Sequence, residues 1–304
     1  MVEKTAHIDV CIASYKRPQL LAKLLSCLAG QNLPDGVTMA AIVVDNDPAG
    51  SARSAVEAAM AAGLPAKYFV QPEKNISLTR NMGVANATGE YIAFIDDDEH
   101  TDSGWLNKLY QTLHQYQADV VFGPVNGDLP SNAPAWLVEG HFFEQEHLKT
   151  GSVSPVRGTG NVLLRVNVIP DRLAPFNPIY GLTGGSDTDF FHRLQLAGRR
   201  FIWCEEALVR EAIPPERLTA GWWIRRAFRG GQIFAEIYVV PTSVMKKIPW
   251  FIKRIAFVFV ALVGGLISWP LRKAWGMKCF QKAASNIGQV STLFRYRYDE
   301  YGKG

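Results

Sequence analysis

Short apolar runs alternate with stretches of helical periodicity along the first third of the chain. Four runs are nearly continuously apolar and rich in β-branched or aromatic side chains, which predicts buried strands: residues 8–15, 39–47, 66–71 and 91–98. Between them lie stretches that predict helices: residues 17–34, 51–65 and 77–89. This order predicts successive βαβ units, and therefore an α/β fold whose sheet is parallel and covered by helices.

The pattern changes from Ile248 onward. An uncharged run of seventeen residues, Ile255–Leu271, is flanked by Lys253-Arg254 and Arg272-Lys273. Its length is at the lower limit for a helix that spans a bilayer. Three interpretations stay open: a helix lying in or dipping into the membrane, a single span, or a buried helix of a soluble core.

Charge is distributed unevenly along the 304 residues. The formal net charge is +4, but the segment from Pro241 to the end holds eleven Lys or Arg and two Asp or Glu. We therefore expect two parts: a domain over 1–240, and a basic, apolar helical region over 241–304 that associates with a membrane surface. Nucleic-acid binding is not expected, because the basic residues surround an apolar segment without an aromatic-interleaved groove motif.

The N-terminal segment and the cysteines indicate the cellular compartment of the protein. The N-terminal segment lacks the apolar region of a signal peptide, since Asp9 and Lys16 interrupt it. The four cysteines show no metal-binding spacing, which is typical of thiols in a reducing compartment. These observations favour the cytoplasmic face of the inner cell membrane.

Polar clusters follow three of the predicted strands: 14–17, 45–47 and 96–98. Ligands of such sheets bind beyond the carboxyl ends of the strands, so we expect these clusters to converge. The three aspartates of "YIAFIDDDEH" repel one another unless a cation is present, and Mg²⁺ or Mn²⁺ is the type of ion that binds carboxylates beside phosphates. The alternative is an acidic helix cap, but Asp102 or Ser103 is better placed to cap the helix that follows.

Four segments carry a family resemblance: "CIASYKRP", "VVDND", "SLTRNMGVANATGEYIAFIDDDEH" and "GGSDTDFFHRLQLAG". In this order they resemble the motifs of family 2 glycosyltransferases, which are inverting enzymes of the GT-A fold. The stretch "IPPERLTAGWWIRRAFRGGQ" is similar to the bacterial branch that builds exopolysaccharide or lipopolysaccharide. The resemblance implies a Rossmann-like, mostly parallel central sheet with flanking helices.

The resemblance also implies roles for individual residues. Those expected to bind the nucleotide sugar are Ala13, Tyr15, Arg17, Asp45, Arg80, Asn81, Asp96 and Asp97. Asp98 matches the metal ligand, and Asp45 matches the contact to the nucleotide base, which favours UDP. Asp97 would point away from its neighbours if the strand continued that far.

The catalytic base is expected in "GGSDTDFFHRL". The resemblance places it at Asp187, with Ser186 where relatives often have glutamate, and leaves Asp189 to orient the loop. Diphosphate or acceptor contacts are assigned to Arg225, Arg226, Arg229, Asp189 and Trp136; for the arginines, contact with anionic lipid is an equal alternative. Glu99, His100 and Glu211 receive no role.

The sequence thus predicts an inverting glycosyltransferase that moves a sugar from a nucleotide-sugar donor to a saccharide or lipid-linked acceptor in cell-surface polysaccharide synthesis. Two alternatives stay open: a nucleotidyltransferase, which would release pyrophosphate, and a non-catalytic scaffold of the same fold. The donor sugar, the acceptor and the linkage cannot be predicted from these motifs.

Overall fold

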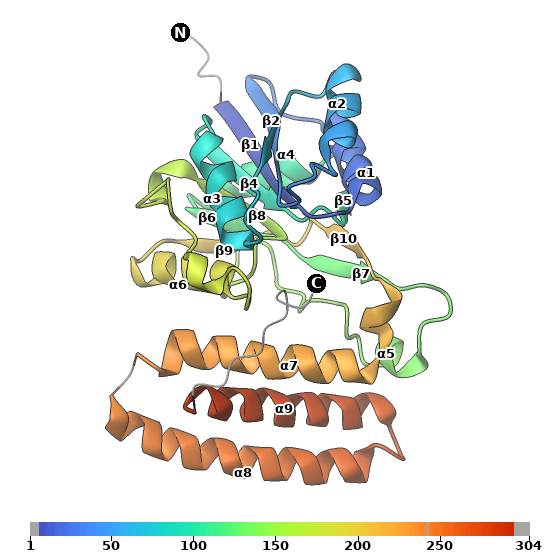
Figure 1. Ribbon diagram of the computed structural model, residues 1–304, viewed down its shortest axis with the longest axis vertical. Helices are drawn as coiled ribbons and strands as arrows, with labels where there is room; N and C mark the ends of the chain where they lie inside the picture. The colour runs from blue at the N-terminus through green and yellow to red at the C-terminus, as the bar shows by residue number, and fades with distance from the viewer. Residues whose placement is uncertain (1–5, 242, 295–304) are drawn as a thin grey trace. The chain divides into compact units, whose positions relative to one another are not determined.

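The four apolar runs form adjacent strands, β3, β2, β1 and β4, in a seven-stranded sheet with the order β3-β2-β1-β4-β8-β6-β9 (Figure 1). The computed structural model describes residues 6–241 and 243–294. The strands are β1 (Ala6–Ser14), β2 (Val37–Asp45), β3 (Ala66–Val70), β4 (Tyr91–Ile95), β6 (Val120–Phe122), β8 (Asn161–Arg165) and β9 (Phe201–Trp203). The first four strands are parallel to one another, β8 runs antiparallel to β4 and β6, and β9 is parallel to β6. The prediction of a mostly parallel α/β sheet is confirmed.

Helices cover both faces of this sheet. They are α1 (Pro18–Ala29), α2 (Arg53–Ala61), α3 (Ile76–Asn86), α4 (Trp105–Gln115) and α6 (Ser186–Leu196). Ile8, Val10 and Ile12 of β1 belong to the core that includes α1, α2 and α4, whereas Cys11 belongs to the core formed with α3 and α6. This alternation follows from the two-residue period of a strand, and it leaves β1 buried on both sides.

A second, three-stranded sheet was not predicted. It has the order β5-β10-β7, with β5 (Glu99–Thr101), β10 (Val209–Ala212) and β7 (Val125–Asp128). β5 and β10 are antiparallel, and Glu211 lies opposite Glu99. The acidic cluster therefore sits in a short connection between the two sheets, where its backbone is held at both ends.

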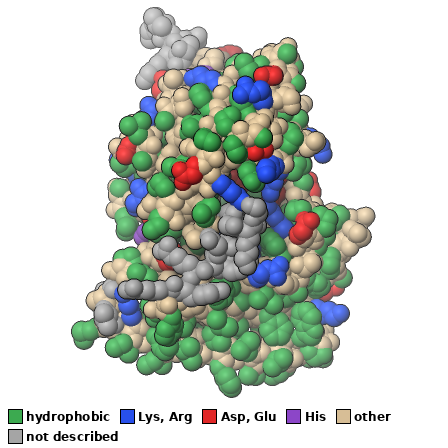
Figure 2. All heavy atoms as spheres, viewed as in Figure 1, with side chains coloured by type: hydrophobic (Ala, Val, Ile, Leu, Met, Phe, Trp, Pro, Cys, Tyr) green, Lys and Arg blue, Asp and Glu red, His purple; other side chains and the backbone are tan. Residues whose placement is uncertain are grey.

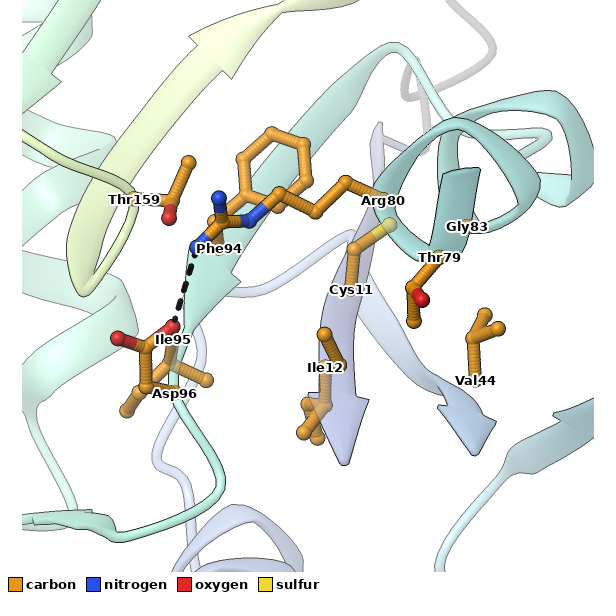
Figure 3. Close-up of a pocket in the computed structure, with 11 residues that line it drawn as sticks. Cys11, Ile12, Val44, Thr79, Arg80, Gly83, Phe94, Ile95, Asp96 and Thr159 are labelled. Carbon is orange, nitrogen blue, oxygen red and sulfur yellow. Dashed lines mark ion pairs between the residues drawn. The ribbon is translucent and has the colours of Figure 1, made fainter. Parts of the chain in front are cut away.

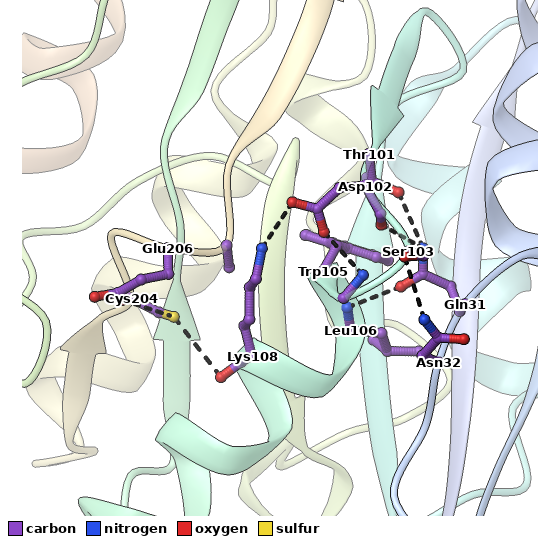
Figure 4. A network of polar contacts seen from close by, with 12 residues as sticks. Gln31, Asn32, Thr101, Asp102, Ser103, Trp105, Leu106, Lys108, Cys204 and Glu206 are labelled. Atoms are coloured by element: carbon purple, nitrogen blue, oxygen red, sulfur yellow. Dashed lines mark hydrogen bonds and ion pairs between the residues drawn. The ribbon is translucent and has the colours of Figure 1, made fainter.

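Gln31 fixes the segment that follows the acidic cluster (Figure 4). Its side-chain amide donates to the carbonyl of Asp102 at 2.7 Å and accepts from the backbone N–H of Leu106 at 3.0 Å. Helix α4 begins after Gly104, which is its N-cap, and Asp102 accepts a hydrogen bond from the Gly104 N–H at 2.8 Å. The expectation that Asp102 or Ser103 caps this helix was wrong, because the Asp102 carboxylate closes the preceding turn instead.

The chain divides into two compact units. The first comprises Met1–Gly127, Gln145–Leu182 and Ser186–Ala212, and the second comprises Asp128–Glu144, Thr183–Gly185 and Ile213–Gly304. The second unit contains α5 (Ala135–Glu139), α7 (Ala220–Phe234), a π-helical segment (Ala235–Val239), α8 (Val244–Ser268) and α9 (Lys273–Thr292). Short 3-10 turns occur at Val166–Val168, Pro178–Tyr180 and Pro215–Leu218.

Within the second unit, α9 packs against both α7 and α8 (Figure 1). Gly231 of α7 lies against the backbone of Ser285, and Gly288 of α9 lies against the backbone of Phe228, with no room for a Cβ atom at either glycine. Close backbone approach through small residues is common among helices that pack in or at membranes.

The outer surface of α8 is apolar and exposed. Ile252, Phe259 and Leu266 share one helical face and are 63%, 70% and 69% exposed, and Figure 2 shows apolar side chains gathered over this helix. Residues 247–268 are long and apolar enough to cross a membrane, and only 6% of their most apolar window is buried. The interpretation of this run as a buried core helix was therefore wrong.

Candidate active site

The four acids that follow β4 have different surroundings. The strand ends at Ile95, so the alternation of strand side chains does not extend to Asp97. Asp97 is 4% exposed, and its carboxylate accepts hydrogen bonds from the Ser14 hydroxyl at 2.8 Å and the Tyr15 N–H at 3.4 Å. Asp97 therefore faces the end of β1 and ties the two strand ends together.

Arg17 lies between two of these carboxylates. Its Nη1 is 2.7 Å from Asp98 Oδ2 and 3.2 Å from Asp97 Oδ1. The guanidinium is partly exposed, whereas both carboxylates are buried. A charged donor between two buried acids offsets part of their mutual repulsion.

Asp96 is the most exposed of the three aspartates, with 46% of its side chain accessible. Desolvation by the surrounding protein raises its pKa to about 7; Arg80 opposes this rise, and Asp98 and Asp97 add to it. Glu99 is buried, and desolvation followed by the charge of Asp96 raises its pKa well above the ordinary value. Glu99 also accepts the backbone N–H of Asp96 at 2.7 Å, a role that the sequence did not reveal.

Arg80 connects the acidic cluster to α6. Its Nη2 is 3.7 Å from Asp96 Oδ1, and its Nη1 donates to the Ser186 hydroxyl at 3.2 Å. The guanidinium also lies 5.8 Å from the centre of the Phe176 ring. Arg80 and Asp96 line a pocket at the ends of β1 and β4 (Figure 3).

Asn81 is the next residue of α3 and points elsewhere. It is 5% exposed, its amide donates to the Phe176 carbonyl at 2.8 Å, and it accepts the Phe176 N–H at 2.8 Å. These two bonds fix the backbone of Phe176, whose ring lies against the Arg80 guanidinium. The structure thus gives Asn81 a positioning role, and the contact expected from the resemblance stays a prediction.

Asp187 and Asp189 lie in the first turn of α6 and differ in their partners. Asp187 accepts the N–H of Thr188 at 2.7 Å, and its side chain is partly accessible. Asp189 forms an ion pair with Arg193, with 3.0 Å between Oδ2 and Nε. The expected base, Asp187, thus lies at the start of α6, next to Ser186, which Arg80 contacts. Asp189 is paired with Arg193 one turn further along the same helix.

The predicted nucleotide-base end of the site is more enclosed. Asp45 is 0% exposed and accepts hydrogen bonds from the N–H groups of Ala52 at 2.7 Å and Asp47 at 2.9 Å, and from the Tyr68 hydroxyl at 3.0 Å. A carboxylate has about four acceptor positions, so one is left. Contact between Asp45 and a base would require the loop after β2 to open.

Ala13 and Tyr15 lie at the end of β1. Ala13 lines the pocket with Arg80 and Asp96. The Tyr15 ring has the Lys16 and Lys74 ammonium groups 5.1 Å and 5.4 Å from its centre. This positive, aromatic edge is suited to a planar, anionic ligand.

The remaining candidates belong to the second unit. Arg225, Arg226 and Arg229 are on α7, and Trp136 is on α5. Arg226 lies 5.0 Å from the centre of the Trp222 ring, and the Trp136 ring contacts Phe142 edge to face at 5.1 Å. Arg225 and Arg226 are exposed, whereas the Nε and Nη1 atoms of Arg229 are buried.

The acidic cluster has the composition that a hard divalent ion needs. Among the residues that the structure describes, no three His, Cys, Asp or Glu side chains form a complete set of metal ligands. Mg²⁺ commonly uses only one or two carboxylates and completes its shell with water and substrate phosphates. Asp98 and Asp96 fit that use, because burial and, to a lesser extent, the charges of Asp98 and Asp97 raise the pKa of Asp96, and an added cation favours its ionised form.

Comparisons with known proteins agree with this geometry. The family model for glycosyl transferase family 2 matches residues 9–173. The chain is 36% identical over 240 residues to the succinoglycan biosynthesis protein ExoM of Rhizobium meliloti (strain 1021), covering 76% of this chain and 75% of that protein.

Solved structures share the fold. S. aureus TarS 1-349 in complex with UDP has a TM-score of 0.55 and 16% identity, over 98% of this chain and 97% of that one. The mannosyltransferase PcManGT from Pyrobaculum calidifontis, in complex with GDP-Man and Mn²⁺, has a TM-score of 0.59 and 16% identity, over 96% of this chain and 75% of that one. These likenesses show a GT-A-like fold for this chain.

Proposed function

This chain belongs to glycosyl transferase family 2 and is a glycosyltransferase, and from this premise we propose that it transfers a sugar from a nucleotide sugar to a saccharide or lipid-linked saccharide. The observation that carries the proposal is Arg80, which contacts both Asp96 and Ser186. A guanidinium between the acidic cluster and the helix of the expected base is suited to a diphosphate. The likeness to ExoM supports a role in polysaccharide synthesis.

The donor binds at the carboxyl ends of β1 and β4. Arg80 and Arg17 approach the diphosphate, and Tyr15 stacks on the nucleotide base with Ala13 below it. Asp98 and Asp96 would hold Mg²⁺ or Mn²⁺, and the bound ion would supply positive charge to the leaving diphosphate. UDP is the carrier to test first, because the remaining acceptor position of Asp45 can accept the N3–H of uracil once the loop after β2 opens.

Asp187 acts as general base. The acceptor hydroxyl oxygen attacks the anomeric carbon from the face opposite the diphosphate, and its proton passes to the Asp187 carboxylate. The new C–O bond forms as the bond to the diphosphate breaks, and the leaving oxygen keeps the electron pair. Because one displacement occurs, the configuration at the anomeric carbon inverts.

The membrane surface is the expected partner of α8. Three apolar side chains of one face are exposed, and the segment from residue 244 to 294 carries basic but no acidic residues. Such a helix binds an anionic leaflet through buried apolar area and charge.

The helix is expected to lie in the plane of the membrane. Residues 269–272 alone separate α8 from α9, and α9 packs along α8 while exposing Lys278 and Lys282. A spanning α8 would carry these lysines to bilayer depth, at a cost of about 2.5–3.5 kcal/mol each. The location is the cytoplasmic leaflet, where the acceptor would be a lipid-linked saccharide.

Arg225, Arg226, Arg229 and Trp136 are proposed to contact the acceptor. An aromatic ring and guanidinium groups together suit a sugar attached to a diphosphate. Binding of the arginines to anionic lipid headgroups is the competing role, and alanine variants separate the two. An acceptor role raises the KM for acceptor at fixed vesicle binding, whereas a lipid role weakens vesicle binding.

A panel of sugar nucleotides tests the proposed function. The purified protein is incubated with each donor, Mn²⁺ and membrane lipid extract, and free nucleoside diphosphate is measured. We expect one donor to release nucleoside diphosphate and to label a lipid or saccharide product. Pyrophosphate release would indicate nucleotidyl transfer, and no release from any donor by folded protein would contradict the proposal.

A further inference from the structure

A three-residue segment before β8 runs between two carboxylates. A Cβ atom on Gly158 would lie 2.8 Å from Asp187 Oδ2, and one on Gly160 would lie 2.5 Å from Glu99 Oε1. A Cβ atom at either position would push the neighbouring carboxylate aside. The segment thus lies between Asp187, in the first turn of α6, and Glu99 of the acidic cluster.

The residue between these glycines has a buried hydroxyl without a partner. Thr159 is 2% exposed, and its Oγ1 makes no hydrogen bond with any residue of the described chain. It lines the pocket that Arg80 and Asp96 also line, and Figure 3 shows the three side chains facing the same space. An unpaired buried hydroxyl destabilises a fold, so its persistence beside a binding pocket indicates a partner that arrives with a ligand.

The position of Thr159 indicates which part of the sugar-nucleotide donor its hydroxyl would contact. Arg80 and Asp96 are assigned to the diphosphate end of the donor, and Asp187 is assigned to the acceptor oxygen. The group between a diphosphate and the attacking oxygen is the sugar that is transferred. We propose that the Thr159 hydroxyl hydrogen-bonds a hydroxyl of the transferred sugar and thereby helps to select the donor, an inference that rests on the proposed function.

Thr159→Val tests this proposal because valine has nearly the same shape without the hydroxyl. The expected kcat/KM for the accepted donor falls roughly three- to tenfold, as for one lost hydrogen bond, while the inhibition constant of the free nucleoside diphosphate is unchanged. Thr159→Ser is expected to restore kcat/KM. The melting temperature of Thr159→Val is expected to stay equal or rise, because an unpaired polar group has been removed.

Donor analogues locate the contacted hydroxyl. Deoxy-sugar nucleotides are compared on wild type and Thr159→Val, and one deoxy position is expected to reduce kcat/KM for wild type but cause no further loss in the variant. Ser77→Ala is the matched control. The Ser77 hydroxyl is also buried without a partner, but Ser77 does not line this pocket.

The outcomes separate the two hypotheses. If the wild-type protein turned over no donor, the proposed function would be refuted. If Thr159→Val were active with unchanged kcat/KM for every analogue, only the role of Thr159 would be refuted. A fall in melting temperature, or an equal loss of nucleoside diphosphate affinity, would also overturn it, because the hydroxyl would then serve the fold or the nucleotide.

Discussion

At the scale of residues, two arginines and one backbone hydrogen bond hold the four acids after β4. Arg17 reaches Asp97 and Asp98, Arg80 reaches Asp96, and Glu99 holds the backbone N–H of Asp96. The two arginines supply the positive charge that the sequence of four acids lacks. The carboxylates are thus fixed before any donor binds, which reduces the reorganisation that binding requires.

Asp187→Asn is expected to lower kcat by about 10²- to 10⁴-fold, because asparagine cannot accept the acceptor proton. Affinity for the sugar nucleotide is expected to survive. Single-turnover kinetics and donor titration measure the two effects. Asp189→Asn is the control: it breaks the ion pair with Arg193, so a modest loss of stability is expected. Wild-type kcat in Asp187→Asn would refute the assignment.

The pKa of Asp96 predicts a dependence of stability on pH. Its ordinary pKa is 3.8 and its folded pKa is about 7, so the folded state binds the proton more tightly between these values. This contribution to stability is complete below the ordinary pKa and is lost as pH rises through about 7. Melting temperatures in EDTA are expected to rise in Asp96→Asn relative to wild type as pH increases. A constant difference across this range would contradict the raised pKa.

Asn81 is expected to matter for the fold. Asn81→Ala leaves the Phe176 N–H and carbonyl without partners, and should lower the free energy of unfolding by about 2–4 kcal/mol. Urea denaturation measures this loss. In the folded fraction, the KM for donor is expected to change little. Unchanged stability with a raised KM would favour the ligand contact that the resemblance implies.

The sequence predicted which site residues lie together where these residues directly follow the strands. The aspartates after Ile95 and the arginine after β1 were expected to meet, because parallel strands end at one edge. Ser14 was expected at this edge, but its hydrogen bond to Asp97 was not, and no role was predicted for Glu99 or Thr159. Their roles depend on which atoms lack or gain partners in three dimensions, and no periodicity reports this.

At the scale of elements, the first four strands and their helices were predictable because local pattern and chain order agree. The other side of the sheet was not. β8 pairs with β4 across about seventy residues and runs antiparallel to it, and the three-stranded sheet joins segments from distant parts of the chain. Except for β8, the strands that were missed have only three or four residues and carry little periodicity, so their partners are set by tertiary packing.

The exposed face of α8 predicts membrane binding. Replacing Ile252, Phe259 and Leu266 by asparagine should reduce partitioning to anionic vesicles by roughly tenfold or more for each side chain, without unfolding, because these side chains are exposed. Vesicle sedimentation measures the effect. Ile287→Asn on α9 is the control, since Ile287 is also exposed. Unchanged sedimentation of the triple variant would refute this surface.

At the scale of the whole molecule, the orientation of α8 can be tested by labelling. Cys27 and Cys279 are replaced, while Cys11 and Cys204 remain, because burial raises the pKa of both thiols. Single cysteines are then placed at Lys247 and Lys273, near the two ends of α8. An impermeant maleimide should label both from the outside of sealed inverted vesicles. Labelling of only one would show a span.

The exposed apolar face of α8 has a kinetic consequence. An enzyme that rests on a leaflet meets a lipid-linked acceptor by diffusion in two dimensions. Its rate then follows the mole fraction of acceptor among the lipids, and added inert lipid slows the reaction although the bulk concentration is unchanged. The same chain in solution would show no such surface dilution.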